Sequence, residues 1–128
     1  MINKNSFKLS IIIPCYNENQ TIDKIISKIS KSISTYNYLN YELIIVDDNS
    51  TDGTKDKLKK YELDKNINVL FHNENLGKGT VIQSAIRHVS GELVLIQDAD
   101  LEYDPFDYDK LLLPFLKQMH MLFMVQGS

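Results

Sequence analysis

The stretch "YELIIVDDNSTDGT", residues 41–54, joins a short run of consecutive apolar side chains to a cluster of acids and small polar residues. Its apolar part, Glu42–Val46, has the length of a strand rather than of a helix. Consecutive apolar positions, rather than alternating ones, are typical of strands that are covered on both faces, as in a parallel sheet. The stretch therefore predicts a buried strand of an α/β protein, followed by a polar loop.

The same pattern recurs on both sides of this stretch. Further strands are predicted at Leu9–Ile13, Ile67–Phe71 and Leu93–Gln97. Apolar residues at helical spacing predict helices between the strands, at 22–33 and at 81–89, and Gly91 is expected to cap the second of these helices. A weaker helix is expected over 51–61, and a last one over 105–116. The order β-α-β-α-β-α-β predicts an α/β sheet with right-handed crossovers.

Composition narrows the class of protein. A chain of 128 residues supports one hydrophobic core, and a net charge of −3 argues against a nucleic-acid partner. The single cysteine, Cys15, excludes an intrachain disulfide framework and a metal site built from several cysteines. No apolar run reaches the roughly 18 residues of a membrane-spanning helix. Because residues 1–8 lack the apolar core of a signal peptide, the expected location is cytoplasmic.

Polar residues follow three of the predicted strands. They form the segments Pro14–Glu18, Asp47–Gly53 and Asp98–Pro105. In a parallel sheet, ligands bind beyond the carboxyl ends of the strands, so these segments are expected to converge on one site. Each segment alone has a simpler explanation, because Ser50 or Asp52 can cap a helix or a turn. The convergence of three such segments favours a functional site.

The clustered acids indicate a divalent cation. Two unit charges about 4 Å apart repel by roughly 4 kcal/mol at an effective dielectric constant of 20, and a bound cation relieves that repulsion. Asp98 and Asp100, separated by one small residue, present two oxygen ligands and leave other coordination positions open. Mg²⁺ and Mn²⁺ suit such ligands, and phosphate oxygens of a substrate complete their coordination.

A fourth loop, residues 73–80, opens the helix predicted at 81–89. Its two glycines and Lys78 suit an anion at a helix N-terminus, although a plain surface turn explains them equally well. The spacing of a P-loop is absent, and no Gly-x-Gly-x-x-Gly follows the first strand.

Taken together, four motifs carry a family resemblance. They are "LSIIIPCYNENQTI", "YELIIVDDNSTDGT", "NENLGKGTVIQSAI" and "GELVLIQDADLEYDP". In this order they resemble the nucleotide-sugar half of inverting glycosyltransferases with the GT-A fold, and most closely the polyprenyl-phosphate (dolichyl-phosphate) mannosyl- and glucosyltransferases. The resemblance runs from about residue 9 to residue 116. It implies a three-layer αβα architecture with a mainly parallel, Rossmann-like sheet.

The resemblance also implies roles for matching residues. Pro14, Tyr16 and Glu18 resemble residues that line the base and ribose pocket, and Asp47 or Asp48 resembles the acid that accepts a hydrogen bond from the base. The implied nucleotide-binding set is Pro14, Tyr16, Glu18, Asp47, Asp48, Lys78 and Asp98. The implied ligands of Mg²⁺ or Mn²⁺ are Asp98, Asp100 and Glu102. Lys78 is expected near the diphosphate.

In this family an acceptor oxygen attacks the anomeric carbon of a UDP- or GDP-sugar, and the metal stabilises the departing nucleoside diphosphate. The implied acceptor is a polyprenyl phosphate or a glycan. A hydroxyl acceptor requires a carboxylate base, which relatives carry in a second half of the fold that this sequence lacks. The resemblance implies peripheral association of the full-length enzyme with the inner face of the membrane.

The last residues follow no recognisable period. We therefore divide the chain into a nucleotide-sugar-binding half, residues 1–117, and an atypical tail, residues 118–128. One allowed set of codons for 119–127 reads A-Y-V-V-Y-G-S-R in another frame, similar to a D-V-V-Y-G-S-R strand of relatives. Our hypothesis is that the native frame is lost near Gln118, and we expect this polypeptide to bind a nucleotide weakly without transferring sugar.

Two alternatives stay open at this point. One is a non-catalytic nucleotide-binding fragment. The other is a response-regulator receiver domain, although its acidic pair follows the first strand and here a strand and a helix come before it. Cys15 is expected to be a small buried side chain beside the pocket. None of the histidines, His72, His88 and His120, has a partner at the spacing of metal ligands.

Overall fold

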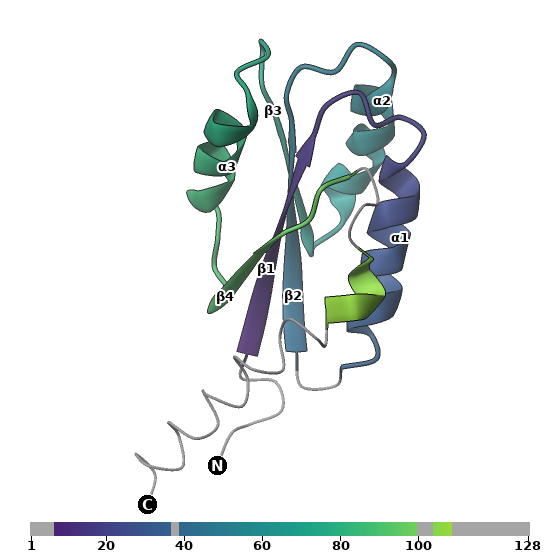
Figure 1. Ribbon diagram of the computed structural model, residues 1–128, viewed down its shortest axis with the longest axis vertical. Coiled ribbons are helices and arrows are strands. Elements are labelled where there is room, and N and C mark those ends of the chain that lie inside the picture. The colour runs from purple at the N-terminus through teal and green to yellow at the C-terminus, as the bar shows by residue number, and fades with distance from the viewer. Residues whose placement is uncertain (1–6, 37–38, 100–103, 109–128) are drawn as a thin grey trace, which may run out of the picture.

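The computed structural model describes residues 7–36, 39–99 and 104–108, which form a parallel sheet between helices (Figure 1). The sheet has the strand order β3-β2-β1-β4, and all three neighbouring pairs run parallel. Its strands are β1 (Phe7–Cys15), β2 (Leu39–Asp47), β3 (Ile67–Phe71) and β4 (Leu93–Ile96). Both the parallel sheet and the four predicted strands are confirmed.

Helices cover the sheet on both faces (Figure 1). The helix α1 (Ile22–Ile33), the short helix α2 (Thr54–Lys59) and the 3₁₀ turn η1 (Lys60–Leu63) lie on one face. The helix α3 (Lys78–Ile86) lies on the other. The three-layer αβα architecture is therefore confirmed.

Two apolar clusters hold the layers together, because successive side chains of a strand point to opposite faces. On β1, Ile11 and Ile13 pack into the cluster beneath α1, whereas Ile12 packs into the cluster beneath α3 with Val81 and Ala85. All three isoleucines are fully buried. Burial on both faces explains why the strands appear in the sequence as uninterrupted apolar runs.

The end of α3 differs from the expectation. The helix ends at Ile86, and Gly91 is not its cap. Val89 still packs on the second apolar cluster from the turn beyond the helix, so its apolar character extended the helical pattern too far. Gly91 has a different role: a Cβ atom there would lie 2.6 Å from the Lys8 carbonyl oxygen.

Two other elements are shorter than the sequence predicts. The weak helix predicted at 51–61 is the six-residue α2 followed by η1, and β4 ends at Ile96, one residue early. At the start of the helix predicted over 105–116, the structure has the 3₁₀ turn η2 (Pro105–Asp107), which packs beside α1. Residues 109–116, the boundary at 117 and the tail all lie outside the described residues.

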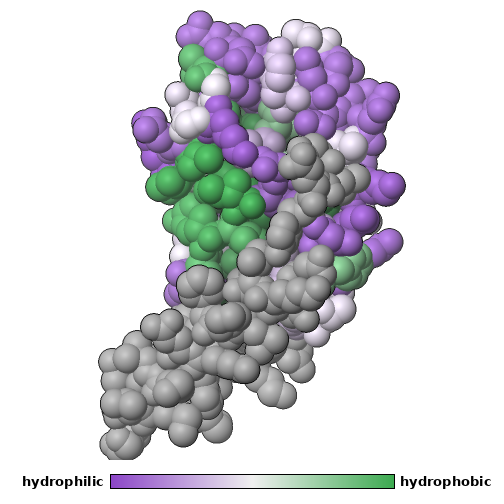
Figure 2. All heavy atoms as spheres, in the orientation of Figure 1, coloured by the Kyte–Doolittle hydropathy of each residue, from purple (hydrophilic) through white to green (hydrophobic). Residues whose placement is uncertain are grey.

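Among the described strands, β4 lies at an edge of the sheet, and the side chains on one of its faces are about half exposed. Its side chains Leu93 and Leu95 pack against the core beneath α1, whereas Val94 and Ile96 point to the α3 side and stay about half exposed. Ile86 of α3 is exposed as well. Figure 2 shows an apolar area over α3 and β4. Within the described ranges, no helix combines the length and apolar character needed to cross a bilayer.

Candidate functional site

The polar loops after β1 and β2 are joined by hydrogen bonds. The register pairs Cys15 with Asp47, so the two loops leave the sheet side by side. The Asn17 N–H donates to the Ser50 hydroxyl at 2.9 Å, and the Thr51 N–H donates to Asn17 Oδ1 at 2.7 Å. Asn17 has a φ of 53°, a left-handed conformation that asparagine tolerates better than most residues. These contacts hold the first two loops as one unit.

A small cavity opens where these loops meet the start of α3. Its volume is about 180 Å³, and its lining consists of Pro14, Cys15, Tyr16, Glu18, Asp48, Lys78 and Val81. Five of the seven residues of the implied nucleotide-binding set therefore line one cavity: Pro14, Tyr16, Glu18, Asp48 and Lys78. Tyr16 is about half exposed at its mouth.

The two neighbouring acids after β2 have different surroundings. Asp47 is completely buried, and its carboxylate accepts hydrogen bonds from the Ser50 hydroxyl at 2.5 Å and from the Ser50 N–H at 3.0 Å. It stabilises the turn that follows the strand and does not line the cavity. Asp48, the next residue, does line it. The sequence left Asp47 and Asp48 as alternatives, and only Asp48 faces the cavity.

Asp48 also anchors the loop before α3. Its Oδ1 accepts the Leu76 N–H at 2.9 Å, and its Oδ2 accepts the Gly77 N–H at 2.9 Å. Burial alone would raise the pKa of Asp48, but hydrogen bonds from Leu76, His72 and Gly77 outweigh burial and hold that pKa below its ordinary value. Asp48 is therefore an ionised acceptor at neutral pH.

His72 is a site residue that the sequence analysis missed. Its Nδ1 lies 2.9 Å from Asp48 Oδ1, and its Nε2 lies 2.9 Å from the Ser84 hydroxyl of α3. The available signal was positional: His72 follows β3 as Asp48 follows β2, and the register pairs Phe71 with Asp47. Asp48 and His72 lie 24 positions apart in the sequence, so short-range spacing does not reveal the contact.

Lys78 and Asp98 meet at the outer side of the site. The Lys78 ammonium lies 2.7 Å from Asp98 Oδ1, and both side chains are about half exposed. Lys78 is the first residue of α3, whose N-terminal N–H groups favour negative charge. Ala99, which follows Asp98 in the chain, is buried, and its carbonyl accepts a 2.6 Å hydrogen bond from the Thr21 hydroxyl. The loop after β4 is thereby tied to the start of α1.

The metal-ligand set is only partly visible. Asp98 offers a hard oxygen ligand of the kind that Mg²⁺ and Mn²⁺ prefer, whereas Asp100 and Glu102 lie outside the described residues. In the described part of the chain, no group of three histidine, cysteine, aspartate or glutamate side chains could hold a metal ion. The chemistry of Asp98 fits a divalent cation, and one carboxylate alone does not complete a site.

Cys15 behaves as the sequence predicted. It is buried beside the cavity as a free thiol. Burial, together with the nearby charges of Asp47 and Glu18, raises the pKa of the thiol well above its ordinary value. A buried thiol with a raised pKa is a poor nucleophile at neutral pH.

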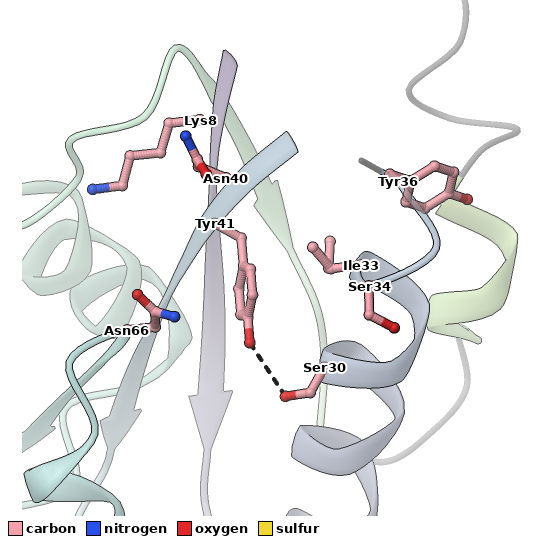
Figure 3. Close-up of a pocket in the computed structure, with 8 residues that line it drawn as sticks. All are labelled: Lys8, Ser30, Ile33, Ser34, Tyr36, Asn40, Tyr41 and Asn66. Carbon is pink, nitrogen blue, oxygen red and sulfur yellow. Dashed lines mark hydrogen bonds between the residues drawn. The ribbon is translucent and has the colours of Figure 1, made fainter. Parts of the chain in front are cut away.

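A larger cavity of about 490 Å³ lies at the opposite, amino end of the sheet (Figure 3). It lies between the end of α1 and the first residues of β1 and β2, where the Tyr41 hydroxyl lies 3.4 Å from the Ser30 hydroxyl. Lys8 is the charged residue in its described lining. Ligands of parallel sheets bind at the carboxyl ends of the strands, so the smaller cavity is the candidate site.

The cavity lies beyond the carboxyl ends of β1 and β2, which is where open parallel α/β sheets, including those of nucleotide-binding enzymes, bind their ligands. Residues 10–126 match the sequence profile of Glycosyl transferase family 2, and the chain belongs to this family. This membership also excludes the receiver domain, the weaker of the two alternatives.

Curated relatives support the same assignment. The chain is 30% identical over 105 residues to the dolichol-phosphate mannosyltransferase of Pyrococcus furiosus, covering 82% of this chain and 29% of that protein. It is 38% identical over 106 residues to a dolichyl-phosphate beta-glucosyltransferase of Trichomonas vaginalis, covering 74% and 31%. The chain thus spans about a third of the length of these relatives.

Solved structures share the fold. The Staphylococcus aureus protein TarS, residues 1–349, in complex with UDP-GlcNAc is 29% identical with a TM-score of 0.69, covering 88% of this chain and 32% of that one. The mannosyltransferase PcManGT of Pyrobaculum calidifontis, in complex with GDP-Man and Mn²⁺, is 29% identical with a TM-score of 0.65, covering 77% and 29%. The expected GT-A, Rossmann-like fold is confirmed.

Proposed function

We propose that this chain is the nucleotide-sugar-binding half of an inverting glycosyltransferase, which transfers a hexosyl group from a UDP- or GDP-sugar to a polyprenyl phosphate or a glycan. The observation that supports this most is the cavity at the strand ends, where Tyr16, Asp48 and Lys78 meet. The chain spans about a third of the length of its curated relatives. For this reason the transfer activity, which belongs to the whole protein, is proposed here together with nucleotide binding.

In this proposal the cavity takes the nucleoside. Pro14, Tyr16 and Glu18 line the base and ribose pocket, and Asp48 accepts a hydrogen bond from the base. The small volume of the cavity is consistent with one part of a nucleotide rather than a whole nucleotide-sugar. Asp47 acts indirectly, because it holds the Ser50 turn that follows β2.

The diphosphate belongs, in this proposal, between the cavity and the end of β4. Asp98, with Asp100 and Glu102, would hold Mg²⁺ or Mn²⁺, and such a cation supplies positive charge to stabilise a departing nucleoside diphosphate. Mn²⁺ is present in the PcManGT complex. Lys78 adds positive charge at the N-terminus of α3, where an anion is also favoured by the helix.

The proposed acceptor follows from the names of the relatives, which act on dolichol or dolichyl phosphate. A lipid phosphate is already an anion and needs little deprotonation, whereas a hydroxyl acceptor needs a general base. With a lipid-phosphate acceptor, the enzyme would work peripherally at the inner face of the membrane.

Calorimetric titration of UDP in the presence of Mn²⁺ tests the binding half of the proposal. Tyr16→Ala should weaken binding about tenfold, because stacking of a base on an aromatic ring contributes about 1–3 kcal/mol. The matched control, Leu63→Ala, removes an exposed apolar side chain far from the cavity and should leave the Kd unchanged. Equal effects of the two substitutions would contradict the proposed pocket.

A transfer assay separates the enzyme from the alternative of a non-catalytic fragment. Purified protein is incubated with UDP- and GDP-sugars, Mn²⁺ and a polyprenyl phosphate, and glycosylated lipid is measured. Transfer supports a complete enzyme activity in this chain. Nucleotide binding without transfer supports the non-catalytic fragment.

A further inference from the structure

The hydrogen bonds of Asp48 leave its carboxylate with little spare capacity. A carboxylate offers about four acceptor positions, two on each oxygen. On Asp48, Oδ1 accepts from His72 and from the Leu76 N–H, and Oδ2 accepts from the Gly77 N–H. One position, on Oδ2, stays open.

The assignment of the His72 proton follows from its partners. An ionised carboxylate only accepts, so Nδ1 of His72 carries the hydrogen and donates it to Asp48. Nε2 lies 2.9 Å from the Ser84 hydroxyl, which contacts the other side of the ring. Because His72 is held from both sides, its Nδ1–H occupies one acceptor position on Asp48.

We propose that Asp48, restricted by His72 to a single open acceptor, selects uridine nucleotides over guanosine and cytidine nucleotides. This inference rests on the proposed function, because it concerns the same cavity. Uracil presents one hydrogen-bond donor, N3–H, between two carbonyl groups. One donor matches one open acceptor, and no polar group of this pair is left unpaired.

The other bases match less well. Guanine presents two adjacent donors, N1–H and the 2-amino group, which suit a carboxylate with both oxygens free. The one open acceptor of Asp48 can take only one of these donors. Cytosine, placed as uracil is, would turn the lone pair of its unprotonated N3 toward the carboxylate oxygen. Its 4-amino donor would reach the open acceptor only after a shift of the ring. The relatives do not decide the base, since one similar structure holds UDP-GlcNAc and another holds GDP-Man.

His72 becomes a specificity-determining residue in this account. The Leu76 and Gly77 donors belong to the backbone and are present with any side chain, whereas the His72 donor depends on its imidazole. Loss of this donor frees a second acceptor on Asp48, on the other oxygen. The preference for a base with one donor should then weaken.

The direct test is a titration of the unmodified chain with four ligands in the presence of Mn²⁺. We expect UDP to bind at least tenfold more tightly than GDP, CDP and N3-methyl-UDP, because a hydrogen bond to a charged group contributes about 1.5–3 kcal/mol. GDP binding as tight as UDP binding would overturn the inference and leave the proposed function standing. No binding of UDP or of GDP would overturn the proposed function itself.

Two variants test the part played by His72. His72→Leu removes both hydrogen bonds of the ring, and the ratio of the GDP and UDP dissociation constants should fall at least threefold. His72→Gln is the matched control, because its amide can donate to Asp48 and accept from Ser84, so the ratio should be retained. A merely structural role would weaken both nucleotides equally and keep the ratio constant in both variants, which would overturn the role of His72.

Discussion

Gly91 lies where the chain has no room for a side chain. A Cβ atom there would stand 2.6 Å from the Lys8 carbonyl oxygen, 2.7 Å from the Ser10 hydroxyl and 2.9 Å from the Ser10 nitrogen. Two of these atoms belong to the backbone of the central strand β1. Glu42 joins the chain before Gly91 to β1, because its carboxylate accepts hydrogen bonds from the Ser10 hydroxyl and from the Ser90 N–H. At this residue, close approach rather than backbone freedom requires glycine.

Gly91→Ala should therefore destabilise the protein, because the neighbouring backbone of β1 must shift. We expect a loss of about 1–3 kcal/mol in the free energy of unfolding, the usual range for overpacking. Urea denaturation measures it. The matched control is Gly79→Ala, since a Cβ at position 79 meets nothing within 4 Å and lies in α3. There alanine should stabilise by about 0.5–1 kcal/mol. Equal effects at the two positions would refute this explanation.

Among the elements, β4 is the strand whose two faces should contribute differently to the free energy of unfolding. Leu95 packs against the core beneath α1, whereas its neighbour Val94 is half exposed on the other face. Among the described strands, β4 pairs with β1 alone. Of its described side chains, Leu93 and Leu95 are the ones that pack on the core.

Leu95→Ala should lower the free energy of unfolding by about 1–2 kcal/mol, because it removes the apolar contacts that a partly buried side chain makes with the core. Val94→Thr keeps the shape of a half-exposed side chain and should change it by less than about 0.5 kcal/mol. Chemical denaturation of both variants gives the comparison. A larger loss from Val94→Thr would show that the α3 side of β4 is covered in solution.

The sequence predicts the strands and helices well where their side chains are completely buried. It predicts a helix end poorly where apolar side chains still pack on the core after the helical hydrogen bonds have stopped. The consecutive isoleucines of β1 and the stripe of α1 were predictable, because each pattern has one physical explanation. Val89 continues the apolar period of α3 after the helix has ended, so the boundary was wrong. Convergence of the loops followed from the parallel sheet, but the choice between Asp47 and Asp48 depends on turn geometry.

For the whole molecule, several carboxylates link stability to pH. Burial would raise the pKa of Glu42, but hydrogen bonds from Ser10 and Ser90 and the charge of Lys8 outweigh it and lower that pKa. Asp48 behaves in the same way. Asp23 is a third case, with hydrogen bonds from Tyr61 and Lys60 opposing the effect of burial. All three acids hold their protons less tightly in the folded chain than in the unfolded one.

A group whose pKa is lowered by folding stabilises the fold above its unfolded value and loses that contribution as the pH falls through its folded value. Unfolded aspartate and glutamate have pKa values of about 4. We therefore expect the free energy of unfolding to be steady between about pH 5 and 7 and to fall below about pH 4. Glu42→Gln should flatten the fall. Denaturation curves that coincide at pH 3 and pH 6 would contradict the linkage.

The central claim is that the carboxylates that follow β4 hold a divalent cation, which receives a nucleoside diphosphate beside the cavity at the strand ends. Its most direct measurement is the Kd of UDP, by calorimetry, with and without Mn²⁺, in three forms of the chain. The unmodified chain should bind UDP at least tenfold more tightly with Mn²⁺ than without it. Asp98→Asn should remove this difference, and Asp56→Asn, which makes the same charge change at an exposed residue of α2, should retain it. UDP binding that is indifferent to Mn²⁺ in the unmodified chain, or equally affected by both substitutions, would contradict the claim.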